Sequence, residues 1–76
     1  MVELVAQIAR RLVDDPDSVR VDTTEEDGAL VLHLHVAPDD LGKVIGRQGR
    51  IARALRTLVR AGSIREGRRL VLRIGE

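Results

Sequence analysis

Residues 42–51 have the sequence GKVIGRQGRI, which places three glycines and three positive charges within ten positions. Glycine is frequent where helices end or chains turn, because without a Cβ it adopts a positive φ at no steric cost. We therefore expect a short helix that ends at Gly46 and a longer helix that starts at Gly49. The GRQG bend, residues 46–49, then joins two helices around which the rest of the chain must pack.

The residues before this stretch predict a helix and a β-hairpin. Apolar residues recur at three- and four-residue steps over residues 2–13, as on one side of an amphipathic helix. The sequence DDPDS then breaks the helix, and residues 19–24 and 29–36 alternate between two faces on either side of the turn sequence EEDG. In the second strand the core face consists of Leu30, Leu32, Leu34 and Val36, and the opposite face of Val31, His33 and His35.

The remaining residues complete the fold prediction. The sequence PDD at 38–40 suits the start of the short helix, because its acids favour the positive end of the helix dipole. Residues 49–61 predict the longer helix, closed by Gly62, and residues 69–74 a last strand. Because two helices separate the last two strands, this crossover makes the final strand parallel to its partner. We expect one α+β domain over residues 1–76: a two-layer α/β sandwich in the order α-β-β-α-α-β, with three helices on one face of a mixed three-stranded sheet.

The composition limits what such a domain can do. A chain of 76 residues buries only about 60% of its unfolded surface, which leaves little room for a deep active site. The absence of Phe, Tyr and Trp excludes the base stacking on aromatic rings that many single-strand binders use. The absence of cysteine excludes disulfides and thiolate metal sites. No apolar run approaches the about 20 residues of a membrane span, and the start MVELVAQIARRLV does not resemble a signal peptide, so we expect a cytoplasmic protein without a membrane partner.

Charge is divided between the two halves of the chain. Residues 1–40 carry three basic and ten acidic residues, a net charge of −7, whereas residues 41–76 carry ten basic and two acidic residues, a net charge of +8. Arg53, Arg56 and Arg60 form a stripe of one sign on the longer helix, although like charges at this spacing repel by about 0.2–0.5 kcal/mol per pair. This pattern favours a polyanion as partner, with the arginines of the stripe steering its approach.

The GRQG bend has the chemistry to hold a sugar-phosphate backbone. N–H groups at the start of a helix are unpaired and available to phosphate. Gly46 and Gly49 let another backbone approach closely, Arg47 offers a charged forked donor, and Gln48 offers a neutral donor and acceptor. Beside the bend, Val44 and Ile45 are candidates for an apolar floor on which bases lie.

The sequence KVIGRQGR, followed by an amphipathic helix, resembles the K homology (KH) domain motif, whose GxxG loop clamps about four nucleotides of a single strand. The expected order of elements is that of the type II form found in bacteria. The small size and the sequences ELVAQIARRLVDDPDSV, DDLGKVIGRQGRIARALRTLVRA and EGRRLVLRIGE are similar to those of the bacterial KhpA family of stand-alone KH proteins. The resemblance covers essentially the whole chain.

The resemblance implies a function and a set of contact residues. It implies non-catalytic binding of single-stranded RNA, in the manner of an RNA chaperone, with no cofactor and no small-molecule substrate. It also implies pairing with a second copy or with a larger KH-containing partner, KhpB. The clamp positions are Gly46, Arg47, Gln48 and Gly49, and the flanking positions that line the groove or touch phosphate are Lys43, Val44, Ile45, Arg50 and Arg53.

Two other functions remain open at this point. Residues 39–61 are also compatible with a DNA-binding helix-turn-helix, in which the second helix reads the major groove of a duplex. A module that binds only protein is the second alternative. A nucleotide-binding P-loop is excluded because no Ser or Thr follows Lys43 and no glycine lies five residues before Gly42.

Metal binding and catalysis are not expected. His33 and His35 share one strand face, but zinc needs further ligands and the chain has no cysteine. The paired acids lie at predicted turns and helix starts, where local hydrogen bonds account for them. These acids are Asp14 and Asp15, Glu25 to Asp27, and Asp39 and Asp40.

Overall fold

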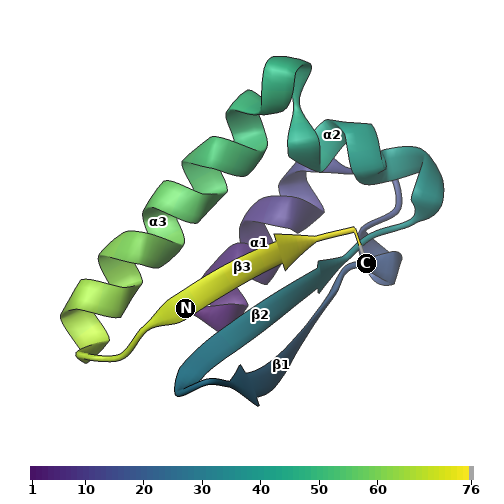
Figure 1. Ribbon diagram of the computed structural model, residues 1–76. Helices are drawn as coiled ribbons and strands as arrows, with labels where there is room; N and C mark the ends of the chain where they lie inside the picture. The colour runs from purple at the N-terminus through teal and green to yellow at the C-terminus, as the bar shows by residue number, and fades with distance from the viewer. Residues whose placement is uncertain (76) are drawn as a thin grey trace.

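Three helices pack on one face of a three-stranded sheet (Figure 1). The computed structural model describes residues 1–75. Its helices and strands are α1 (Val2–Leu12), β1 (Arg20–Glu26), β2 (Ala29–His35), α2 (Leu41–Ile45), α3 (Arg50–Glu66) and β3 (Leu70–Ile74). Short 3-10 turns cover Pro16–Ser18, Pro38–Asp40 and Arg47–Gly49. The predicted order α-β-β-α-α-β is confirmed.

The sheet is mixed, with β2 in the centre. β1 and β2 are antiparallel, β2 and β3 are parallel, and Val31 lies opposite Thr24 on one side and Val71 on the other. The hairpin turn needs only two residues, Asp27 and Gly28, with φ of 52° and 80°. Tight hairpins require such positive values because they match the strand twist. β1 therefore continues to Glu26, two residues beyond the predicted strand.

The core lies between the helices and the inner face of the sheet. Leu32 and Leu34 are fully buried on that face, as the alternation predicted. The buried apolar side chains that pack together are Val5, Ala6 and Ala9 of α1, Val19, Leu32 and Leu34, Val44 of α2, Leu55 and Val59 of α3, and Leu70 and Leu72 of β3. Each helix contributes to this cluster, so all three are fixed to the sheet by burial of apolar surface.

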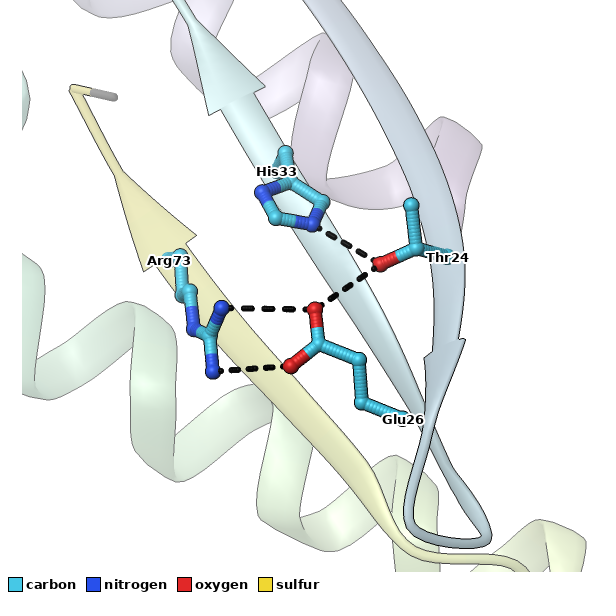
Figure 2. A network of polar contacts seen from close by, with 4 residues as sticks. All are labelled: Thr24, Glu26, His33 and Arg73. Carbon is cyan, nitrogen blue, oxygen red and sulfur yellow. Dashed lines mark hydrogen bonds and ion pairs between the residues drawn. The ribbon is translucent and has the colours of Figure 1, made fainter.

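Polar side chains join the three strands across the outer face of the sheet (Figure 2). Both guanidinium nitrogens of Arg73 donate to the carboxylate of Glu26, at 3.4 and 3.2 Å, so the pair crosses β2. The Thr24 hydroxyl donates to Glu26 at 3.3 Å and lies 3.0 Å from Nε2 of His33. These contacts provide partners for Thr24, Glu26 and Arg73 on the outer face, and Val31 beneath them is only 2% exposed.

The end predicted for the longer helix is wrong. α3 does not stop at Gly62 but runs to Glu66, and Gly67 ends it with a φ of 64°. Gly62 is buried inside the helix, where a Cβ would lie next to the flexible end of the Met1 side chain and 3.5 Å from Cδ1 of Leu70. The extra turn adds Arg65 to the basic helix.

Candidate nucleic-acid interface

The GRQG bend has an unusual backbone. Gly46, Gln48 and Gly49 have φ values of 77°, 57° and 74°. The Gly46 N–H donates to the Gly42 carbonyl at 2.9 Å, and the Gly49 N–H donates to the Gly46 carbonyl at 3.1 Å. In the described part of the chain the exposed side chains of Arg47 and Gln48 make no hydrogen bond or ion pair. Two polar side chains therefore extend from a bend whose backbone is fixed.

The two glycines of the bend are required for different reasons. A Cβ at Gly46 would lie 2.7 Å from Cγ1 and 2.9 Å from the backbone nitrogen of Ile51, so this glycine lets α3 pack against the end of α2. At Gly49 a Cβ would meet nothing within 4 Å. Open space at Gly49 is what an external backbone needs for close approach, whereas Gly46 is explained by internal packing.

The residues expected to flank the bend lie in different environments. Val44 is 0% exposed and belongs to the core, so the expectation that it forms a surface floor for bases is wrong. Ile45 is partly buried beside it, and Arg50 and Arg53 are exposed at the start of α3. Lys43 is held by two carboxylates, with Nζ 3.2 Å from Oδ2 of Asp14 and 3.4 Å from Oδ1 of Asp40.

Asp40 is buried and bound to a distant part of the chain. Its Oδ2 accepts the backbone N–H of Asp15 at 3.0 Å, across 25 positions. Burial acts to raise the pKa of Asp40, but backbone N–H groups of Asp15 and Asp14 and the ion pair with Lys43 outweigh it and lower the pKa below its ordinary value. The Lys43 pKa is raised, chiefly by its hydrogen bond to Asp14. The expectation that local hydrogen bonds account for Asp40 is therefore wrong.

This carboxylate makes the fold sensitive to acid. A pKa that is lower in the folded than in the unfolded state stabilises the fold above the ordinary value of 3.8, and the stabilisation is lost as pH falls through the folded value. We expect the free energy of unfolding to decline between about pH 5 and pH 2, and to decline less in Asp40→Asn. Urea unfolding followed by far-ultraviolet circular dichroism measures both slopes. Equal acid slopes for the two proteins would contradict the role assigned to Asp40.

Arginines without a partner gather around the bend and along α3. In the chain from residue 1 to residue 75, Lys43, Arg68 and Arg73 pair with acids, and Arg68 reaches Glu25 of β1 at 2.9 Å. The basic residues after position 40 that have no carboxylate within 4.0 Å in this range are Arg47, Arg50, Arg53, Arg56, Arg60, Arg65 and Arg69. Uncompensated charge of one sign on one helix and its loop attracts polyanions.

A hollow of about 420 Å³ lies between α3 and β3. We call it the α3–β3 hollow; its lining residues are Arg56, Val59, Arg60, Ser63, Arg69, Leu70, Val71 and Leu72. β3 pairs with β2 alone, so its other edge borders the hollow. The Ser63 hydroxyl ties the two elements together, because it accepts the Leu70 N–H at 2.8 Å. A floor of aliphatic side chains flanked by arginines is thus present, but it is built from α3 and β3, and its accessible part is Val71, because Val59, Leu70 and Leu72 are 1%, 7% and 4% exposed.

Sequence reasoning missed this floor for a physical reason. Val59 and Leu72 were recognisable as core residues from their spacing, but no local pattern says that α3 lies along the free edge of β3. The crossover connection brings these elements together, and that contact is tertiary. Arg56 and Arg60 were expected to steer a ligand, with direct contact left open, and both line the hollow.

The mixed sheet, the order of elements and the GRQG bend between two helices define a type II KH domain. A sequence profile described as KhpA/KhpB, KH domain, matches residues 2–74. The chain belongs to this family of KH domains, as its sequence resemblance indicated.

Named relatives match over nearly their whole length. The RNA-binding protein KhpA of Caldanaerobacter subterraneus subsp. tengcongensis is 50% identical, over 97% of this chain and 99% of that protein. KhpA of Aquifex aeolicus is 50% identical, over 97% and 94%, and KhpA of Treponema pallidum is 51% identical, over 95% and 90%. No solved structure matches the chain. Among residues 1–75, no helix is long and apolar enough to span a membrane.

Proposed function

We propose that this protein binds single-stranded RNA without catalysis, with the sugar-phosphate backbone held at the GRQG bend and the bases directed into the α3–β3 hollow. The observation that carries the proposal is the set of arginines that have no carboxylate partner among residues 1–75, which begins at the bend and includes Arg56 and Arg60 of the hollow. The relatives named RNA-binding protein KhpA support the class of ligand.

The dimensions suit a short strand. Gly49 and Arg56 are seven positions apart, about 10 Å along a helix that rises 1.5 Å per residue. The strand that a KH domain clamps has about four nucleotides, which is enough to extend from the bend into the hollow. The floor contains only aliphatic side chains, so bases rest on it without aromatic stacking. We expect modest affinity and low base selectivity, because stacking on an aromatic ring contributes about 1–3 kcal/mol per base elsewhere.

Such a short contact favours action with a partner. A second RNA-binding domain raises the effective affinity because its binding becomes intramolecular. We therefore include in the proposal a cytoplasmic RNA-chaperone role, with pairing to a second copy or to a larger KhpB-like chain. Sedimentation with and without RNA measures pairing between copies of the chain. A protein that is strictly monomeric in both conditions would contradict self-pairing.

The arginines of the hollow provide the test of the RNA path. Replacement of Arg56 and Arg60 by glutamate is expected to weaken binding of a short single-stranded RNA at least about tenfold, since a charged hydrogen bond contributes about 1.5–3 kcal/mol and 1.4 kcal/mol is tenfold. The slope of log affinity against log salt should become shallower by about 0.7 per lost phosphate contact. Fluorescence anisotropy with labelled RNA at several salt concentrations measures both.

A matched control separates local contact from overall charge. Arg10 and Arg11 of α1 are exposed, and their replacement by glutamate changes the net charge by the same amount. If both double variants lose affinity equally, the hollow is not the RNA path. A titration with duplex DNA tests the helix-turn-helix alternative, which requires tighter binding to the duplex than to the single strand.

A further inference from the structure

The chain that precedes the GRQG bend is fastened to the fold by a buried charge. Asp40 is 2% exposed and is the one polar or charged side chain that is buried among residues 1–75. It stands directly before α2, while its carboxylate is bonded to the backbone of Asp15, in the connection between α1 and β1. Lys43, one turn further along, closes the link by contacting both Asp14 and Asp40.

This carboxylate does not cap its own helix. Asp40 occupies the position before the first residue of α2, but it makes no side-chain capping hydrogen bond there. An aspartate in that position usually accepts an N–H of the following turn, which stabilises the helix by about 0.5–2 kcal/mol. Here the carboxylate points to a segment 25 positions earlier. Its effect is therefore on where α2 lies, and only indirectly on whether α2 is helical.

α2 depends on such attachments because it is short. With five residues it falls far below the about 12–15 residues at which isolated helices become even marginally stable. Val44 attaches it to the core, and Ile51 packs against Gly46 at its C-terminal end. Asp40 and Lys43 are the polar attachment at the N-terminal end. The bend follows directly, so its position relative to α3 depends on how firmly both ends of α2 are held.

We infer that Asp40 is a positioning residue for RNA binding, which with Lys43 fastens α2 to the connection after α1 and so holds the GRQG bend in its binding geometry. This inference rests on the proposed function, because the bend is taken as the RNA clamp. In this inference Lys43 holds α2 in place and does not contact the phosphate of the RNA. A bend that moves must be ordered again when RNA binds, and that ordering opposes binding.

The variant Asp40→Asn tests the inference, because it keeps the size of the side chain and removes its charge. At a temperature well below its unfolding midpoint, we expect amide hydrogen exchange at Gly46 and Gly49 to accelerate about tenfold, since their bonds to Gly42 and Gly46 belong to the loosened segment. Affinity for a short single-stranded RNA is expected to fall about fivefold or more. Lys43→Met, which leaves the Asp15 contact in place, should change both quantities in the same direction.

Val31→Ala is the matched control. Val31 is equally buried but lies on the outer face of the sheet, so its truncation destabilises the fold without touching α2. It should leave exchange at Gly46 and Gly49 and RNA affinity at the wild-type values in the folded protein. Should Asp40→Asn behave like Val31→Ala in both measurements, the inference would be overturned.

The two proposals can fail separately. If wild-type protein does not bind single-stranded RNA, the proposed function fails, yet faster exchange in Asp40→Asn would still support the attachment of the bend. If Asp40→Asn does not fold, Lys43→Met provides the same two measurements. A double variant, Asp40→Asn with Lys43→Met, should lose less RNA affinity than the sum of the two single losses, because the two side chains contact each other and belong to one attachment. Additive losses of RNA affinity would instead indicate that Lys43 contacts phosphate directly.

Discussion

Replacement of Arg47 and Gln48 by aspartate, with both glycines of the bend kept, should reduce the affinity for single-stranded RNA at least about 30-fold. Loss of one charged hydrogen bond accounts for about tenfold or more, and two carboxylates in the bend add repulsion of phosphate. The fold should be unchanged, because both side chains are exposed and aspartate tolerates the positive φ of 57° at position 48. Fluorescence anisotropy with a short labelled RNA measures the loss.

The control for this variant changes the same residue types elsewhere. Gln7 and Arg10 of α1 are exposed, and their replacement by aspartate alters the net charge as much as the bend variant does. We expect this control to bind RNA within about threefold of wild type, because neither residue belongs to the bend or lines the α3–β3 hollow and exposed charges outside the contact are largely screened at physiological salt. A folded bend variant with unchanged RNA affinity would refute the clamp.

The sequence was sufficient to predict the fold where the signals are local. Alternation in residues 29–36 and the glycine-containing turn before them define the hairpin, and the glycines at 46 and 49 define the bend. It was insufficient where tertiary packing overrides a local preference. Gly62 looked like a helix end, but it is buried within α3, which continues to Glu66 and ends at Gly67.

The local parts of the candidate site were predictable from the sequence, and the parts that depend on tertiary contacts were not. The bend and the exposed Arg47 and Gln48 follow from local sequence, whereas the apolar floor does not, because it needs α3 beside the edge of β3. Val44 was assigned to the surface because a five-residue helix has no periodicity that separates its faces. The role of Asp40 depends on a partner 25 positions away, which no local pattern reports.

In the structure, the acidic and basic halves of the chain are linked by ion pairs. Glu25 and Glu26 of β1 pair with Arg68 and Arg73 of the basic half. Arg73 is paired on the outer face of the sheet, and Arg68 is paired between the end of α3 and the start of β3. The arginines of the bend and of α3 keep their charge. Among residues 1–75, the seven arginines named above have no carboxylate within 4.0 Å, and three of them, Arg56, Arg60 and Arg69, line the α3–β3 hollow.

Replacement of Leu32 by alanine should have the largest effect on stability. Leu32 is 0% exposed at the centre of the sheet, between Thr23 and Leu72. Truncation of such a leucine costs about 2–5 kcal/mol, while a domain of this size has a free energy of unfolding of about 4–11 kcal/mol. The unfolding midpoint should fall by at least about 10 °C. Far-ultraviolet circular dichroism is the suitable probe, because the chain has no aromatic side chain.

The matched control for Leu32→Ala is the same substitution at Leu4, which is 44% exposed on α1. The Leu4 side chain buries less apolar surface on folding, and its removal leaves no closed cavity. The unfolding midpoint should therefore fall by only a few degrees. RNA binding adds a second readout, because a ligand that binds only the folded state raises the midpoint in proportion to the logarithm of its concentration. Single-stranded RNA should therefore raise the midpoint of Leu32→Ala, and it should fail to do so when Arg47 and Gln48 are also aspartate. A midpoint that rises equally with and without the intact bend would locate the RNA contact elsewhere on the molecule.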